Sequence, residues 1–413
     1  FAVVAHLALT DMLLTLFMVC GILCLFHRLQ GGNLWILGAG YVALGFAVLV
    51  KGPVALALVG AALVLYLFFA RPGGTSERWY QYWWRNVWSL HPLAGLFLIA
   101  VISVPWYVAE CTATKGEFFQ EFFIRQNLGR VAGSVNHQQP WHYYIPFLIG
   151  GLFPWWLVWV SAPKAVARFW THRKIDGGQQ RLALLCTCWL VLVIALFSAV
   201  KTKLGTYILP AFPPFAILTG LLLDRLIRGR KLLPLKISAT VVACAGVAGL
   251  LAVPVLLARL PISKGAAVAL AGGALLLCAA FAGCLVMLKR KQWTPAVLSA
   301  TGGGAAAVAI LVSFGLHQYD KQQHRPFRDL LKDCQAQHAN VATFLRDSPA
   351  ANFYLCRQVP ILQNREDFSV FLKSTKGPHF VLLTRDVQKL AQERAPKLFQ
   401  LERRGKWFLF SID

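Results

Sequence analysis

Long apolar runs that repeat along the chain constrain its fold more than any other feature of the sequence. Inside a bilayer every backbone N–H and C=O group needs a partner within the protein, so such runs cross the membrane as helices. A crossing of ~30 Å takes roughly 17 to 22 residues. Ten runs have this length, at about 12–28, 34–50, 53–70, 91–109, 143–161, 182–199, 205–226, 237–258, 266–288 and 295–316. The sequence therefore predicts an α-helical polytopic membrane protein with about ten transmembrane helices.

Charged residues are sparse and lie mostly between these runs. Hydrophobic residues make up 57% of the 413 positions and charged residues 14%, which excludes an ordinary soluble protein. Loops on one side of the predicted bundle hold 17 Lys and Arg residues, whereas loops on the other side hold 8. The basic side is predicted to be cytoplasmic, because cytoplasmic loops are enriched in Lys and Arg. The net charge of +24 thus reflects membrane topology, and no nucleic-acid partner is expected.

The segment from His317 to Asp413 differs in composition from the apolar runs. It mixes charges of both signs with short apolar runs at Phe353–Leu355, Val359–Leu362, Phe380–Leu383 and Trp407–Phe410. Helical stretches such as Asp386–Ala395 separate these runs, and alternating strands and helices predict a small α/β domain. We therefore divide the chain into a transmembrane bundle, 1–316, and a C-terminal domain, 317–413, which ten crossings place outside the cytoplasm. A disulfide between Cys334 and Cys356 is an open alternative there.

A polar loop at residues 110–142 interrupts the apolar pattern on the non-cytoplasmic side. Its phenylalanines have the spacing of a helix that lies in the membrane interface with one apolar face, namely Phe118, Phe119, Phe122 and Phe123. Asn127 and Arg130 follow and bring hydrogen-bonding and cationic groups. His137 is either a hydrogen-bonding residue or a ligand of a divalent metal, and the sequence leaves both interpretations open.

Two charged residues occupy places that a simple membrane span avoids. Asp11 lies in LALTDMLL at the outer end of the first span, where a carboxylate is costly unless it faces water, a cation or a polar cavity. It is a candidate functional residue, or alternatively forms the N-cap of a helix together with Thr10. Lys51 lies in VLVKGPVAL, where Gly52 permits a tight turn. Lys51 either binds a ligand or extends from this turn to the membrane surface.

A second cationic element occurs in FSAVKTKLGTYILPAFPP. Lys201 and Lys203 concentrate positive charge on the side that is otherwise poor in it, and Tyr207 follows at the start of a span. This pattern favours a phosphate or pyrophosphate group held at the membrane surface. Together with Asp11 and Lys51 on the same side, it predicts an enzyme that uses a lipid-phosphate substrate. A lipid-linked sugar flippase and a structural partner protein are the alternatives.

Four segments carry a family resemblance. They are LALTDMLLT, LVKGPVALAL, the F-x3-N-x2-R followed by H-x2-P-x2-YY of the polar loop, and FSAVKTKLGTYILPAFPP. In this order they resemble the membrane glycosyltransferases of family 39, and most closely the bacterial 4-amino-4-deoxy-L-arabinose transferases that modify lipid A. The resemblance implies a GT-C fold in the bacterial inner membrane, a periplasmic C-terminal domain and a sugar donor linked to undecaprenyl phosphate. It implies lipid A or another periplasmic molecule as acceptor, and protein O-mannosyltransferases are further relatives.

The resemblance also implies roles for individual residues. Asp11 matches a polar position of the family's active-site cavity and is our candidate catalytic residue, and His137 matches the family histidine that is linked to a bound zinc ion. The residues expected to contact the donor phosphate and sugar are Lys51, Asn127, Arg130, Lys201, Lys203 and Tyr207. The family carries an acidic motif in its first periplasmic loop, and we expect that the chain begins after that loop. On this basis the 413 residues are expected to be inactive alone.

Overall fold

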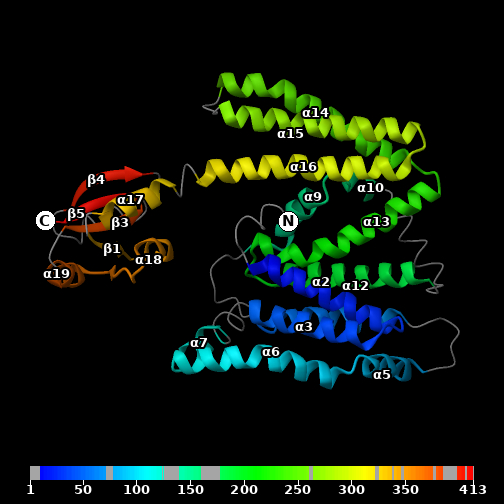
Figure 1. Ribbon diagram of the computed structural model, residues 1–413, viewed down its shortest axis with the longest axis horizontal. Helices are drawn as coiled ribbons and strands as arrows, with labels where there is room; N and C mark the ends of the chain where they lie inside the picture. The colour runs from blue at the N-terminus through cyan, green and yellow to red at the C-terminus, as the bar shows by residue number, and fades with distance from the viewer. Residues whose placement is uncertain are drawn as a thin grey trace. The chain divides into compact units, whose positions relative to one another are not determined.

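The computed structural model describes residues 10–70, 78–122, 124, 139–159, 177–259, 264–320, 325–336, 339–345, 348–374, 378–384, 398–404 and 407–412. The chain divides into two units, Phe1–Leu311 and Val312–Asp413 (Figure 1). The first unit is helical and the second contains a mixed sheet. Each unit has a hydrophobic core of its own.

Helices account for the whole of the first unit's regular structure in the described ranges. With η for a 3-10 helix, they are α2 (Thr10–Leu29), α3 (Leu34–Lys51), α4 (Val54–Phe69), α5 (Trp79–Ser89), α6 (Pro92–Ala113), α7 (Glu117–Phe119), η2 (Trp141–Tyr144), α9 (Ile145–Gly151), α10 (Trp156–Trp159), α12 (Gly178–Ala199), η3 (Gly205–Ala211), α13 (Phe212–Arg228), α14 (Leu233–Arg259), α15 (Lys264–Lys289) and α16 (Trp293–Tyr319), the last of which continues into the second unit.

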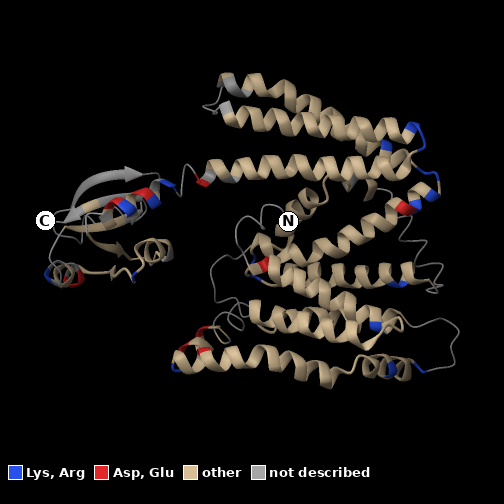
Figure 2. Cartoon of the chain, viewed as in Figure 1, with Lys and Arg blue, Asp and Glu red and all other residues tan. Residues whose placement is uncertain are grey.

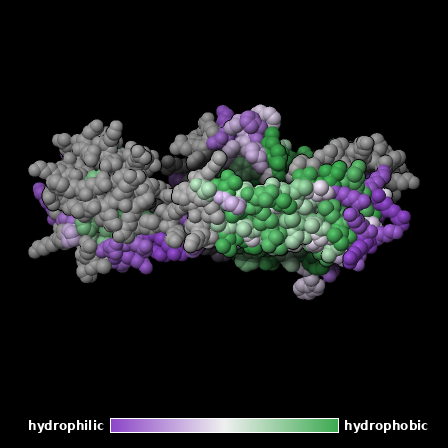
Figure 3. Space-filling model, turned by 90° about the horizontal axis from the view of Figure 1, so that it is seen from above, coloured by the Kyte–Doolittle hydropathy of each residue, from purple (hydrophilic) through white to green (hydrophobic). Residues whose placement is uncertain are grey.

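These helices have the length and composition of membrane spans. Eight helical segments in the described ranges are long and apolar enough to cross a membrane, and α4 is apolar but shorter. Figure 3 shows the apolar surface of the bundle as a belt that ends at a hydrophilic rim. Nine of the ten predicted apolar runs coincide with these helices. The prediction of a multi-pass helical membrane protein is confirmed.

The tenth predicted run, 143–161, does not form one continuous helix, so this prediction is wrong in the described part of the run. There η2, α9 and α10 follow one another, with four, seven and four residues. Gly150 and Gly151 are weak helix formers, and Pro154 lacks the N–H that a continuing helix would donate. Gly151 also allows a close approach, because a Cβ atom there would lie 1.9 Å from the Phe212 ring.

Helices α2 and α3 pack side by side as an antiparallel pair (Figure 1). Small residues let the two backbones approach closely. A Cβ atom on Gly21 would lie 2.6 Å from the Leu44 side chain, and one on Gly40 would lie 2.6 Å from that of Cys24. Because the pair is antiparallel, the first turn of α2 and the last turn of α3 lie at the same end of the bundle.

Basic residues gather at the other end of the bundle, where α2, α13 and α15 end and α14 begins (Figure 2). We call it the basic end, and its connections include residues 30–33, 229–232 and 290–292. The sequence pattern predicts that this end is cytoplasmic.

The second unit is a small sheet with helices. It contains α17 (Arg325–Ala336), β1 (Asn340–Phe344), α18 (Pro349–Leu355), β2 (Ile361–Leu362), α19 (Arg365–Ser374), β3 (His379–Thr384), β4 (Leu398–Arg404) and β5 (Trp407–Ile412). The strand order is β2-β1-β3-β5-β4, with β1 parallel to β2 and β3, and β5 antiparallel to β3 and β4. The predicted α/β character is confirmed. The predicted helix Asp386–Ala395 lies outside the described residues.

The structure corrects one predicted strand of the second unit and decides one alternative that the sequence left open. Phe353–Leu355 lies in α18 rather than in a strand, because Ser348 caps the helix by accepting a backbone hydrogen bond at 3.3 Å and Pro349 opens its first turn. No disulfide joins Cys334, which is buried, to Cys356, which is exposed, and both residues belong to the described part of the chain.

Candidate functional site

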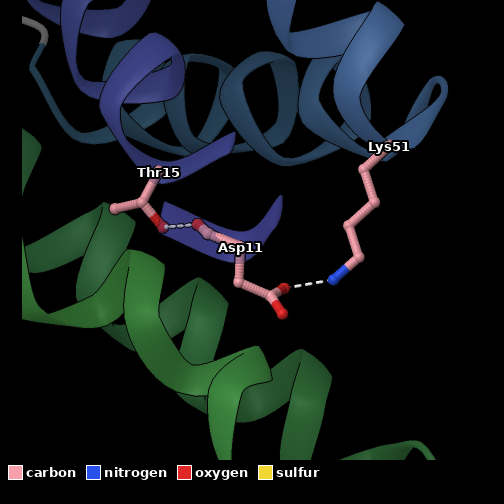
Figure 4. Close-up of polar contacts among 3 residues, drawn as sticks. All are labelled: Asp11, Thr15 and Lys51. Atoms are coloured by element: carbon pink, nitrogen blue, oxygen red, sulfur yellow. Dashed lines mark hydrogen bonds and ion pairs between the residues drawn. The ribbon is translucent and has the colours of Figure 1, made fainter. Parts of the chain in front are cut away.

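An ion pair joins α2 to α3 at the end of the bundle opposite to the basic end (Figure 4). The Lys51 ammonium donates to a carboxylate oxygen of Asp11, although the two residues lie 40 positions apart. The Asp11 side chain is 10% exposed and that of Lys51 is 24% exposed, so both charges are largely removed from water. In such a setting each charge offsets part of the cost of burying the other.

The first turn of α2 fixes the position of Asp11. Asp11 is the second residue of this helix, so it is not the N-cap that the sequence allowed as an alternative. The Thr15 hydroxyl donates to the main-chain oxygen of Asp11 at 2.8 Å, one turn further along the helix. The positive end of the helix dipole also favours a carboxylate at this place. Asp11 therefore presents its side chain to Lys51 from a fixed backbone.

The last turn of α3 holds Lys51 through two hydrogen bonds to one carbonyl. The Gly52 N–H donates to the Val48 oxygen at 2.7 Å, and the Tyr107 hydroxyl of α6 donates to the same oxygen, also at 2.7 Å. Gly52 has φ 75°, a left-handed value that glycine adopts without strain. The tight turn predicted at Gly52 is therefore present, and it coexists with the ion pair.

Tyr207 contributes an aromatic face to the same place. It belongs to η3, which packs against α2, α12 and α13. The Lys51 ammonium lies 4.9 Å from the centroid of the Tyr207 ring, within the range of a cation–π interaction. We call Asp11, Lys51 and Tyr207 the polar cluster. It brings together three of the predicted site residues from three separate segments of the chain.

Lys203 is buried near the start of η3, with 3% of its surface exposed. Its ammonium donates to the main-chain oxygen of Gln139 at 3.1 Å and to that of Val200. The Gln139 N–H in turn donates to the Lys201 oxygen at 3.2 Å. These bonds tie the end of the polar loop to the 200–203 segment. Two of the three N–H donors of the Lys203 ammonium are thus used by carbonyls. The Lys201 side chain, in contrast, is exposed.

The predicted helix is present at the described start of the polar loop, as α7 followed by the π-helical residues 120–122, and its place in the membrane interface stays a prediction. Helix α7 has three residues, and the rings of Phe118 and Phe122 stack 5.1 Å apart. Phe118 also lies 5.6 Å from Trp106, in the C-terminal half of α6. Gly116, with φ 89°, turns the chain back onto this end of α6. Only Phe119 remains substantially exposed, at 47%, among the large hydrophobic residues of α7.

Tyr144 lies one turn beyond this loop, in η2, and is almost completely buried. Burial raises the pKa of the Tyr144 phenol above its ordinary value, and the neighbouring Tyr207 and Tyr143 act in the same direction. Tyr144 therefore stays a neutral hydroxyl at physiological pH. Its position places a neutral polar group beside the ring that receives the Lys51 ammonium.

Three predicted residues, Asn127, Arg130 and His137, lie outside the described residues. Within the described ranges, no group of three or more His, Cys, Asp or Glu side chains has the arrangement of a metal site. The zinc expectation for His137 thus stays a prediction.

Two contributors to the site were not anticipated from the sequence. The hydroxyl of Tyr107 donates a hydrogen bond to the Val48 carbonyl. Its sequence setting, VPWYVAE, is like that of many aromatic residues at membrane interfaces. Gln139 acts through its main-chain groups, which carry no signal in the residue type. Tyr107 could have been found by asking which polar residues near the ends of neighbouring spans can reach one another, whereas nothing in the sequence marks Gln139.

The fold and this cluster together define an integral membrane protein with a charged site at one end of its helix bundle. No family model matches the chain. Its sequence is similar to the undecaprenyl phosphate-alpha-4-amino-4-deoxy-L-arabinose arabinosyl transferase of Enterobacter sp. (strain 638). The two are 35% identical over 184 residues, and this alignment covers 43% of this chain and 30% of the relative. The enzyme of the same name from Edwardsiella ictaluri is 30% identical over 260 residues, covering 62% of this chain and 43% of the relative.

Solved structures extend the similarity to nearly the whole fold. The crystal structure of ArnT from Cupriavidus metallidurans bound to undecaprenyl phosphate matches with a TM-score of 0.70 and 21% identity, and covers 97% of this chain and 74% of that one. Its apo state matches with a TM-score of 0.71 over the same shares. The chain is thus a homologue of these arabinosyl transferases and has the ArnT fold, which confirms the predicted resemblance. The aligned part spans 30% to 43% of the two curated relatives.

Proposed function

We propose that this protein is a glycosyltransferase that moves a sugar, 4-amino-4-deoxy-L-arabinose, from an undecaprenyl-phosphate carrier to lipid A or another periplasmic acceptor. The observation that carries the proposal is the polar cluster, in which a largely buried Lys51 is held by Asp11 and faces the Tyr207 ring. A buried, oriented ammonium at a helix end suits a phosphate group, and an aromatic face suits a sugar ring. The relatives' names and the bound undecaprenyl phosphate in one related structure support the same chemistry.

The proposed location is the bacterial inner membrane, with the polar cluster and the C-terminal unit on the periplasmic side. The loops at the basic end hold most of the Lys and Arg residues of the bundle, which favours the cytoplasm for that end. The polar cluster lies at the opposite end, where an outer-leaflet donor would present its phosphate.

The proposed reaction is attack by an acceptor oxygen on the anomeric carbon of the donor sugar. The new bond forms to this carbon as its bond to the carrier phosphate oxygen breaks, and polyprenyl phosphate leaves. Lys51 and Lys203 would stabilise the charge that develops on the leaving phosphate, which is commonly the largest electrostatic contribution to such catalysis. Lys201, Asn127 and Arg130 remain candidates for the donor contact.

Asp11 has two proposed roles, which depend on the acceptor. An acceptor phosphate is already ionised and needs no base, so Asp11 then acts by orienting Lys51. An acceptor hydroxyl must lose a proton to a carboxylate. Asp11 could take that proton only by exchanging its contact with the Lys51 ammonium for one with the acceptor. A divalent metal at His137, zinc by family resemblance, would add positive charge near the phosphate, and no step above depends on it.

The test uses the protein expressed from its complete gene and reconstituted in vesicles with radiolabelled undecaprenyl-phosphate aminoarabinose and lipid A. Transfer of label to lipid A, seen after separation of the lipids, is the expected result. Movement of the donor between leaflets without a new glycolipid would replace the proposal with a flippase. If neither transfer of label nor movement of the donor is seen, the result would indicate a structural partner protein. A mass increase of lipid A in cells that express the gene would identify sugar and acceptor together.

A further inference from the structure

A cavity of about 350 Å³ opens at the basic end, between the end of α13 and the first turn of α14. Its lining residues are Arg230, Lys231, Leu232, Leu233, Pro234 and Lys236. Half of them carry a positive charge and none carries a negative one. The three charged residues are exposed, so a ligand can reach them from outside. We call this the basic cavity.

The end of α13 fixes two of these charges in place. The Arg230 N–H donates to the Ile227 oxygen at 3.0 Å, and the Lys231 N–H donates to the Leu226 oxygen at 2.9 Å. This pair of bonds is the Schellman arrangement that closes many helices, with Arg230 in the left-handed conformation at φ 52°. The two bases therefore leave the helix end in a defined direction and do not sit on a free loop.

No acidic residue offsets the charge of the cavity within the described part of the chain. The nearest carboxylate in sequence is that of Asp224, and it accepts from Arg228 at 2.9 Å. None of the three basic residues of the cavity forms an ion pair with another described residue. Three positive charges around one cavity attract an anion, and a phosphate group can accept hydrogen bonds from all of them.

An exposed apolar stripe begins at this cavity and runs along α14. Leu233 is 68% exposed, Ile237 is 46% exposed and Val241 is 44% exposed. These residues are spaced four apart, so they lie on one face of the helix. The candidate membrane span of α14 begins at Leu233 itself. The basic cavity therefore lies where headgroups are found, and the stripe lies where acyl chains are found.

We propose that the basic cavity binds the phosphate of an anionic phospholipid, such as phosphatidylglycerol, whose acyl chain lies along the stripe on α14. Free phosphate shares the anionic chemistry, but it gains nothing from the apolar stripe. Basic pockets between membrane helices on the cytoplasmic side are a recurrent way to hold such headgroups. This site lies at the opposite end of the bundle from the polar cluster and is independent of the transfer reaction.

A neighbouring loop provides a matched control for the general effect of positive surface charge on lipid binding at this end of the bundle. Lys289 is the last residue of α15, Arg290 and Lys291 follow it at the same end, and Lys291 has φ 61° in a helix cap of the same kind. Leu235 of α14 and Leu288 of α15 belong to one buried cluster, which places the two segments near each other. The second loop carries the same number of bases but does not line the basic cavity.

The experiment measures lipid retention by native mass spectrometry on the full-length protein in detergent, titrated with phosphatidylglycerol or phosphatidylcholine. The cavity variant carries R230Q, K231Q and K236Q, and the control carries K289Q, R290Q and K291Q. We expect the apparent Kd for phosphatidylglycerol to rise about fivefold for each charge removed from the cavity. The control should keep its affinity within about twofold, and phosphatidylcholine should bind each protein equally weakly.

Three results would overturn the proposal. The first is an equal loss of phosphatidylglycerol in both triple variants, which would reduce the cavity to general surface charge. The second is equal retention of phosphatidylcholine and phosphatidylglycerol by the unmodified protein. The third is displacement of the lipid by an equal concentration of inorganic phosphate, which would assign the cavity to the free ion. If the triple cavity variant inserts poorly into the membrane, the single K236Q variant replaces it. An apparent Kd for phosphatidylglycerol that does not rise about fivefold in K236Q would then overturn the proposal.

Discussion

Two ion pairs of this protein, one at each end of the helix bundle, show how differently the two ends use charge. Asp11 and Lys51 pair across two helices with side chains 10% and 24% exposed, whereas Asp224 and Arg228 pair within α13 with side chains 41% and 74% exposed. An exposed pair contributes about 0–1 kcal/mol, because water screens it. Breaking a buried pair costs about 3–5 kcal/mol, because one charge stays behind without a partner. The pair in the polar cluster should therefore be sensitive to the loss of either charge, whereas the exposed pair at the basic end should not.

Lys51→Ala should produce the largest effect, because it removes the cation proposed to face the donor phosphate. We expect turnover of the labelled donor to fall by about a hundredfold or more, the size of losing one preorganised charge-stabilising donor. Lys51→Arg is the control, since it keeps the charge but alters its reach, and it should retain more activity. Full activity of Lys51→Ala in correctly folded protein would remove the polar cluster from the proposed site.

A double-mutant cycle on Asp11 and Lys51 separates pairing from catalysis. Each single change to Ala should lower the free energy of unfolding by about 2 kcal/mol or more, somewhat below the value for a fully buried pair because Lys51 is partly exposed. The double variant should lose less than the sum of the two and stay inactive. Unfolding in detergent provides the measurement. Additive losses would show that the two side chains do not stabilise each other.

Lys203→Ala should lower turnover by about tenfold or more, the next effect in size. Its ammonium holds the Gln139 and Val200 carbonyls, so the change also loosens the end of the polar loop. Lys201→Ala is the matched comparison, because Lys201 lies two positions away but is exposed. We expect a smaller loss there. Equal losses in the two variants would indicate that charge alone matters in this segment, and near wild-type turnover of Lys203→Ala would refute its proposed role.

Tyr107→Phe tests a residue that acts on the cluster through the backbone. It removes the hydroxyl that donates to the Val48 oxygen in the last turn of α3, and Gly52 still donates to that oxygen. The loss of one such hydrogen bond costs about 1 kcal/mol. Turnover should fall severalfold at saturating donor, with a smaller change in donor affinity. A pure loss of stability with unchanged turnover would limit Tyr107 to a structural role.

Much of the fold could be predicted from the sequence, because a bilayer allows few arrangements of an apolar chain. Nine apolar runs coincide with helices, and the second unit has the expected mixture of strands and helices. The run at 143–161 was mispredicted, because hydropathy does not register Gly150, Gly151 and Pro154 as helix breakers. The short apolar run at Phe353–Leu355 was mispredicted because the Ser348 cap and Pro349 favour a helix there.

The candidate site could be predicted only in its charged part. Asp11 and Lys51 stood out because ionised groups are rare in membrane spans, and the structure brings them into contact. Neither their mutual pairing nor the contact between Phe118 and Trp106 could be foreseen, since both depend on how the helices pack. Main-chain groups such as those of Gln139 are invisible in a sequence of residue types.

Arg228→Gln should have the smallest effect and thereby sharpens the contrast between the two ends. It breaks the exposed pair with Asp224 but leaves no buried charge behind, because the Asp224 side chain is 41% exposed and stays hydrated. We expect the free energy of unfolding to change by about 0.5 kcal/mol or less, and donor turnover to stay the same. The measurement is the same unfolding assay that the Asp11 and Lys51 cycle uses. A loss near 2 kcal/mol would mean that exposure does not distinguish the two pairs, and the difference between the ends would then have to come from ligand binding alone.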